Sequence, residues 1–126
     1  KLPVSEETIH CAVVQHLTLR GCPNICWFHV PNGGSRNVIE AAKLKKMGTR
    51  AGVADLVVII KGRTHFLELK TASGKTSSAQ IAFREAAEAA GTVYEVAKGI
   101  DEALEKLMSW GAFAAGKPMF SGRARA

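Results

Sequence analysis

The sequence predicts an α/β domain in which a mixed β-sheet is flanked by helices. Two observations predict this class: apolar residues recur at helical spacing in several segments, and short β-branched or aromatic runs stand between them. The expected order is α-β-α-β-β-α-β-α, and the two adjacent strands favour an antiparallel hairpin. With 126 residues, 47% of them hydrophobic, the chain can form one compact domain with a core but not two.

The first helix is expected to begin after Ser5, a favoured N-cap residue, and to end at Gly21. Glu6 and Glu7 fall in its first turn, where the helix dipole favours acids. Successive helical side chains turn by about 100°, so Glu6 points in nearly the same direction as the apolar residues, whereas Glu7 points away. We therefore expect Glu6 to face the protein body. The apolar residues at helical spacing are Ile9, Val13 and Leu17.

Residues 25–30 are predicted to form a strand, followed by the loop sequence PNGGS. Ser35 is the expected cap of a second helix that runs to about Met47. This helix and the loop after it hold five basic residues against one acid, Glu40, in a chain of formal net charge +6. Such a cluster is usually a solvated helix face, but here it leads directly into a charged hairpin, which favours a phosphate-binding surface. The basic residues are Arg36, Lys43, Lys45, Lys46 and Arg50.

The second half of the chain begins with the hairpin and ends in a basic tail. Ser77 or Ser78 is expected to cap the helix that follows the hairpin, and Gly91 to end it. The tail, 111–126, is rich in glycine and alanine and is predicted to be partly disordered or to pack on a partner subunit. The predicted elements are strands at 56–60, 65–70 and 92–97 and helices at 79–90 and 101–110.

Three charges stand in or beside the apolar hairpin: Asp55, Glu68 and Lys70. Side chains alternate along a strand, so Glu68 and Lys70 lie on one face, and the turn brings Asp55 near the end of the return strand. A structural ion pair would explain the lysine and one acid, but not readily the second acid. A divalent cation relieves the repulsion between two carboxylates, and a lysine beside it can orient or deprotonate water or offset charge on a phosphoryl transition state. The set favours metal-assisted phosphodiester hydrolysis.

These residues carry a family resemblance. Asp55, a hydrophobic strand, a turn and Glu68-Leu69-Lys70 resemble the D…ExK core of the PD-(D/E)XK nuclease superfamily. The longer string MGTRAGVADLVVI…FLELK…SSAQ resembles the VRR-NUC (virus-type replication-repair nuclease) branch. The resemblance runs from Glu6 to about Gly91 and implies a restriction-endonuclease-like fold, with a single nuclease domain over 1–110. Ala54 stands in the place of the superfamily's proline, which shapes a turn and binds nothing.

The resemblance also implies roles for individual residues. Lys70 would be the catalytic lysine, and Gln80 would match the glutamine that orders the metal-bound water or the scissile phosphate. Glu6 would match the first-helix acid that often supports the metal site. The alternatives without a role in function are that Gln80 is merely an exposed residue at a helix start and that Glu6 merely complements the helix dipole. The implied ligands of Mg²⁺ or Mn²⁺ are Asp55, Glu68, the backbone carbonyl of Leu69 and, as a further candidate, Glu6.

What the resemblance implies about function is a metal-dependent DNA endonuclease that acts on branched DNA, either Holliday junctions or flaps, in DNA repair or replication. Small stand-alone members of the family resemble junction resolvases, so a homodimer is expected. The basic residues from Arg36 to Arg50 would contact the DNA backbone. His29 and Asn32 lie on the loop side and could also touch substrate, although a histidine beside Trp27 and Phe28 is more often structural.

Two other functions compete with this one. The chain could be a non-catalytic DNA-binding module on the same fold, although Asp55, Glu68 and Lys70 are all present, whereas a non-catalytic module would be expected to have lost one of them. It could also be an interaction protein whose hairpin charges simply pair.

Other features of the sequence exclude further classes. LKTASGKTSS imitates a phosphate-binding loop, but Leu69 stands where that motif needs glycine, so no nucleotide cofactor is expected. A zinc site from Cys22, Cys26 and a histidine is a weak alternative to free thiols in a reducing cytosol. No run is long and apolar enough to span a membrane and no signal peptide is visible, so we expect a cytoplasmic protein of a bacterial or phage-infected cell, not a secreted one.

Overall fold

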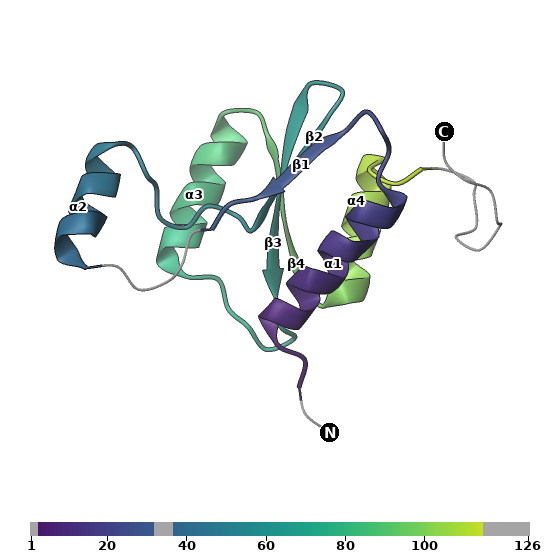
Figure 1. Ribbon diagram of the computed structural model, residues 1–126, viewed down its shortest axis with the longest axis horizontal. Coiled ribbons are helices and arrows are strands. Elements are labelled where there is room, and N and C mark those ends of the chain that lie inside the picture. The colour runs from purple at the N-terminus through teal and green to yellow at the C-terminus, as the bar shows by residue number, and fades with distance from the viewer. Residues whose placement is uncertain (1–2, 32–36, 115–126) are drawn as a thin grey trace.

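The computed structural model describes residues 3–31 and 37–114, and its elements follow the predicted order (Figure 1). Helices and strands alternate along the chain as the spacing of apolar residues indicated, except at the hairpin, where two strands are adjacent as predicted. The elements are α1 (Glu6–Arg20), β1 (Cys26–His29), α2 (Val38–Lys46), β2 (Leu56–Ile60), β3 (Arg63–Lys70), α3 (Ser78–Ala89), β4 (Val93–Lys98) and α4 (Ile100–Trp110).

The four strands form one mixed sheet in the order β1-β2-β3-β4. The first two pairings are antiparallel, and β3 pairs with β4 in parallel. Helix α3 makes the crossover that a parallel connection requires. The predicted mixed sheet flanked by helices is therefore confirmed.

Helices cover both faces of the sheet. The larger core lies between the sheet and the helices α1 and α4, and Figure 1 shows these two helices side by side. A smaller cluster on the other face joins Ala54, Ala87 and Tyr94, with Phe66 and Phe83 packed against it. In α1 the Ser5 hydroxyl caps the Thr8 N–H, as the sequence predicted. The apolar residues predicted to face the core of α1, which are Ile9, Val13 and Leu17, are each at most 2% exposed.

Helix α2 differs from its expected start. Its N-cap is Asn37, whose side chain accepts a hydrogen bond from the Glu40 N–H at 2.7 Å, so the prediction of Ser35 as the cap was wrong. Asparagine and serine are both good caps, and only the backbone decides between them. Within the described part of the chain α2 has no buried residue, and Val38 and Ile39 are 84% and 83% exposed.

The packed body continues past residue 110, the expected domain boundary. Ala112 and Phe113 are buried in the larger core, and Phe113 bridges to Gly21 at the end of α1. The rest of the expected tail, 115–126, lies outside the described residues. Among the helices that the structure describes, none is both long and apolar enough to cross a bilayer.

Candidate functional site

The hairpin brings Asp55 to the end of β3. Leu56 pairs with Leu67, so the residue before Leu56 lies beside the residues after Leu67. Asp55 Oδ2 accepts a hydrogen bond from the Leu69 N–H at 2.8 Å, which fixes the carboxylate at this position. Because the N–H and C=O of one strand residue point to the same side of the strand, the Leu69 carbonyl also faces Asp55. A carboxylate and a carbonyl thus face the same space.

Glu68 and Lys70 lie on one face of β3 and are both buried, with exposed fractions of 2% and 8%. The Lys70 Nζ is 3.7 Å from Glu68 Oε2, at the long end of the range for an ion pair. The other oxygen, Glu68 Oε1, is buried without a hydrogen-bond partner among the described residues. Leaving a buried polar atom without a hydrogen bond costs about 1–3 kcal/mol of folding free energy. A ligand that binds Glu68 Oε1 would remove this cost.

The surroundings of Glu68 favour its protonated form in the metal-free protein. Its pKa is raised from 4.5 to about 7, first by burial and then by the negative charge of Asp55. Lys70 lowers the pKa, and Glu6 raises it by a smaller amount. The lysine therefore does not neutralise the two hairpin acids fully. A cation that replaces the proton would stabilise both carboxylates.

Gln80 links helix α3 to this carboxyl group. Its Nε2 donates a hydrogen bond to Glu68 Oε2 at 2.8 Å, while its Oε1 accepts from the Ser77 N–H at 2.9 Å. The second contact is half of a capping box at the start of α3. A Cβ added to Gly52 would lie 2.3 Å from the Ala79 carbonyl oxygen, so only glycine lets the 47–55 loop approach this helix start so closely. Gln80 is thus more than an exposed helix-start residue.

Glu6 lies on the same side of the molecule as the acids. It is exposed, and it lines a cleft of about 370 Å³ together with Asp55 and Leu69. No hydrogen bond or ion pair joins Glu6 to the acids among the described residues, and Glu7, expected to point away, also lines the cleft. The expectation that Glu6 faces the protein body and Glu7 points away was therefore wrong, because both side chains are exposed and both line the cleft.

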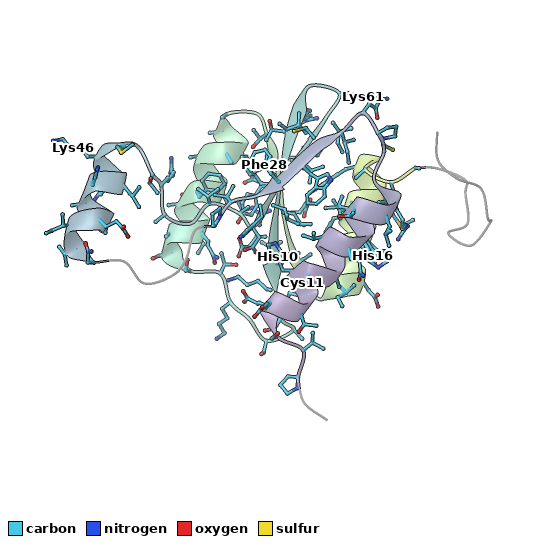
Figure 2. The ribbon with its side chains drawn as sticks, viewed as in Figure 1. His10, Cys11, His16, Phe28, Lys46 and Lys61 are labelled. Atoms are coloured by element: carbon cyan, nitrogen blue, oxygen red, sulfur yellow. The ribbon has the colours of Figure 1, made fainter. Side chains whose placement is uncertain are left out.

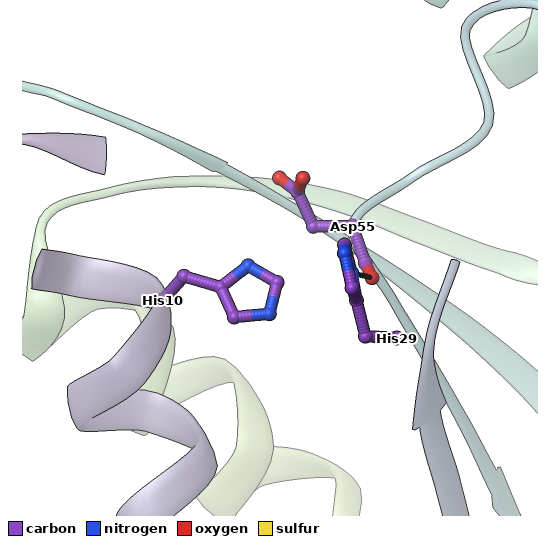
Figure 3. A group of neighbouring side chains, drawn as sticks. All are labelled: His10, His29 and Asp55. Carbon is purple, nitrogen blue, oxygen red and sulfur yellow. Dashed lines mark hydrogen bonds between the residues drawn. The ribbon is translucent and has the colours of Figure 1, made fainter. Parts of the chain in front are cut away.

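Two histidines beside Asp55 belong to the cleft as well. His10 projects from α1 and His29 from β1, and Figure 3 shows both rings close to Asp55. The imidazole rings lie 4.4 Å apart at 84°, and His29 Nδ1 is 2.7 Å from the Asp55 carbonyl oxygen. The pKa of His10 is lowered, mainly by burial and then by His29. Sequence reasoning missed His10, although it follows Glu6 by four residues and so occupies the same side of the helix.

Of the basic residues expected to bind DNA, the three lysines belong to α2, which stands apart from the sheet that carries the acids (Figure 1). Figure 1 shows α2 standing off from the sheet, and Figure 2 places Lys46 at its outer end. Lys43, Lys45 and Lys46 occupy its last turn. Arg50 lies 5.6 Å over the ring of Phe83 and so turns toward α3, whereas Arg36 lies outside the described residues, as does Asn32.

The cysteines do not form a metal site in the described part of the chain. Cys11, Cys22 and Cys26 are all free. Within 3–31 and 37–114, the one group of three potential ligands that come together is His10, His29 and Asp55. A zinc site built on Cys22 and Cys26 is therefore not supported.

Comparison with known proteins identifies the fold. No family model matches the sequence, and no curated protein matches it. Among solved structures, one described as "VRR_NUC domain protein" superposes with a TM-score of 0.72 at 24% identity, over 87% of this chain and 90% of that chain. A second, described as "VRR_NUC domain", superposes with a TM-score of 0.57 at 19% identity, over 84% of this chain and 97% of that one. The chain thus has the fold of the VRR-NUC domain, as the resemblance in its sequence implied.

Proposed function

We propose that the protein is a metal-dependent DNA endonuclease whose active site is the end of the β2–β3 hairpin. The observation that carries the proposal is the buried Glu68 carboxyl, which has one unpartnered oxygen and lies beside Asp55 and Lys70. A purely structural ion pair needs neither the second acid nor the unpartnered oxygen. The likeness to the VRR_NUC structures supports the same reading, because the fold is that of a nuclease family.

The donor set fits Mg²⁺ or Mn²⁺. Both ions prefer oxygen ligands, and Mg²⁺ is commonly held by one or two carboxylates with water and phosphate oxygens. Asp55, Glu68 Oε1 and the Leu69 carbonyl would hold the ion, and Glu6, which lines the same cleft as Asp55 and Leu69, is a further candidate ligand. When bound, such an ion supplies Lewis-acid activation of water and phosphate.

The chain's own groups would do the rest of the chemistry. The Lys70 ammonium lies 3.7 Å from Glu68 Oε2, and it would orient the attacking water and offset negative charge developing on the phosphate. Gln80 donates a hydrogen bond to Glu68 Oε2, the same oxygen that Lys70 approaches. Its amide therefore acts as a positioning group for the metal ligand.

The same proposal includes the substrate and the assembly. Branched DNA, either a four-way junction or a flap, is the substrate class that the resemblance favours, and a homodimer would present two active sites to a symmetric junction. The exposed lysines of α2 and Arg50 would contact the phosphate backbone, because a polyanion attracts such a cluster irrespective of sequence. A cleavage panel of duplex, flap and four-way-junction DNA, with measurement of the oligomeric state, tests this part separately.

The central experiment compares cleavage of DNA by the wild type and by Asp55→Ala, Glu68→Ala and Lys70→Ala. We expect cleavage only with Mg²⁺ or Mn²⁺ and a loss of at least about a hundredfold in each variant, since each removes a group needed for the chemical step. Circular dichroism should show that each variant remains folded. Full activity of Lys70→Ala, or of the wild type in excess EDTA, would exclude the mechanism.

The competing function, a non-catalytic DNA-binding module, makes a different prediction for the same samples. The basic surface of α2 would retain DNA in a gel-shift measurement, but no divalent ion would produce cleavage. Asp55→Ala would then leave DNA binding unchanged, and Mg²⁺ would raise the melting temperature of neither the wild type nor the variant. In the nuclease, Mg²⁺ should raise the melting temperature of the wild type and not that of Asp55→Ala.

A further inference from the structure

The cleft beside the hairpin acids contains a second group of potential ligands. His10 comes from α1, His29 from the end of β1, and Asp55 from the residue before β2. One ligand atom from each lies within 4.8 Å of the other two. Figure 3 shows the two rings and the carboxylate converging from these three segments. The fold therefore gathers two imidazoles next to a carboxylate that the proposed nuclease centre already uses.

The hydrogen bond of His29 leaves this residue able to bind a cation. The Asp55 carbonyl oxygen can only accept a hydrogen bond, so His29 Nδ1 carries the proton and donates it. The other ring nitrogen of the neutral imidazole then keeps its lone pair. Metal-ligating histidines commonly donate their second N–H to a backbone carbonyl in this way.

His10 has no such partner in the apoprotein. Its ring is half-buried and contacts the His29 ring edge to face, but it makes no hydrogen bond among the described residues. Two imidazoles packed together would repel each other if both were charged. A cation between them would instead use a lone pair of each, and it would be attracted by Asp55.

We propose that His10, His29 and Asp55 form a second cation position, which takes a first-row transition ion such as Co²⁺ or Zn²⁺ rather than Mg²⁺. Imidazole nitrogen suits these ions, whereas Mg²⁺ prefers oxygen throughout. The inference deepens the proposed function and rests on it for any catalytic use of the ion, but binding itself is measured without DNA. Asp55 would be shared between the two positions.

The dimensions of the site permit this arrangement. Two ligands that each lie about 2.1 Å from an ion are at most about 4.2 Å apart, so a side-chain adjustment on the order of 1 Å suffices. A carboxylate offers about four lone-pair positions, and only one of those on Asp55 is used by the Leu69 N–H. The cleft of about 370 Å³ leaves room for water as the remaining ligands.

The test is titration of the metal-free full chain, carrying no histidine tag, with Co²⁺, Zn²⁺ and Mg²⁺. Calorimetry measures affinity and stoichiometry, and the visible absorption of Co²⁺ reports the ligands around the ion. We expect His10→Ala and His29→Ala each to weaken Co²⁺ and Zn²⁺ binding at least about tenfold. Both variants should leave Mg²⁺ binding unchanged.

Glu68→Gln and Cys11→Ser are the matched controls. Glu68→Gln should weaken Mg²⁺ binding and retain the Co²⁺ absorption band, so failure of the nuclease proposal and failure of this inference give different results. Cys11 lines the same cleft, and Cys11→Ser should change neither affinity. Unchanged Co²⁺ and Zn²⁺ affinity in both histidine variants would overturn the inference, as would loss of the Co²⁺ band in Cys11→Ser.

Discussion

The end of the β2–β3 hairpin and helix α2 both concentrate charge, but the fold surrounds these charges in opposite ways. At the hairpin end Glu68 is 2% exposed, and its Oε2 is within reach of both Gln80 and Lys70. Helix α2, by contrast, has no buried residue in the described part of the chain, and the three lysines of its last turn are exposed. One region holds each charge in a fixed place, and the other only concentrates charge of one sign.

This difference determines what single substitutions should do. In the hairpin site Asp55 and Glu68 each accept a hydrogen bond of 2.8 Å, and Glu68 and Lys70 are buried, where electrostatic interactions are stronger than in water. On α2 the lysines interact with a ligand through water and salt, which screen charges over about 10 Å. We therefore expect large effects from single changes in the first region and small, additive ones in the second.

The largest expected effect is on the pH dependence of stability in the metal-free protein. The pKa of Glu68 is about 7 in the folded chain against an ordinary 4.5, so the folded state binds this proton more tightly than the unfolded state does. The stability it contributes is fully present below about pH 4.5 and is lost as the pH rises through about 7. One pKa unit corresponds to about 1.4 kcal/mol, so the loss is at most on the order of 3–4 kcal/mol. Urea denaturation in EDTA should show the free energy of unfolding falling between about pH 5 and pH 8.

Glu68→Gln provides the control for this prediction, because its amide stays neutral throughout that pH range. It should remove most of the fall, whereas Glu88→Gln, at an exposed ion pair with Arg84, should retain it. Mg²⁺ added to the wild type above pH 7 should restore stability, since the ion replaces the proton between the carboxylates. Equal pH dependence in the wild type and in Glu68→Gln would mean that another group is responsible.

The two regions also differ in how well the sequence predicted them. Strand alternation put Glu68 and Lys70 on one face, and the short hairpin turn required Asp55 to lie beside the end of β3. Local periodicity was therefore enough to predict that these three residues come together. The contact of Gln80 with Glu68 depends on how α3 packs, and the family resemblance indicated only that Gln80 belongs to the site, not which group it contacts. His10 and His29 meet because α1 packs on the sheet, an arrangement that no local pattern specifies. The cap of α2 was mispredicted because both Ser35 and Asn37 are suitable and no packing distinguishes them in the sequence.

An intermediate effect is expected for Gln80→Ala, because this side chain positions Glu68 without itself taking part in the reaction. Loss of its hydrogen bond should lower DNA cleavage by about tenfold, which corresponds to about 1.4 kcal/mol. Gln80 also belongs to the capping box of α3, and loss of a cap costs about 1 kcal/mol of stability. Cleavage rates at saturating Mg²⁺, together with melting temperatures, measure the two effects.

Ser77→Ala separates the two roles of Gln80. It removes the other half of the capping box but not the contact with Glu68. We expect it to lower the melting temperature about as much as Gln80→Ala does and to leave the cleavage rate close to that of the wild type. If both variants lose activity in parallel with stability, Gln80 acts only as a cap.

The smallest effect is expected for the double variant Lys45→Ala with Lys46→Ala on α2. Removing two exposed positive charges should weaken binding of all DNA sequences alike and reduce the salt dependence of the binding constant by up to about 2 in log–log slope. The cleavage rate of bound DNA should not change, because α2 stands apart from the sheet whose strands carry the hairpin acids (Figure 1). The matched control is Lys61→Gln with Arg63→Gln, which removes the same charge at the hairpin turn, at the other end of β3 from Glu68. An equal loss of affinity in both double variants would show that the net charge of the protein, not the surface of α2, attracts the DNA. Helix α2 would then have no specific role in binding, and the hairpin site would be the only one of the two regions with a defined function.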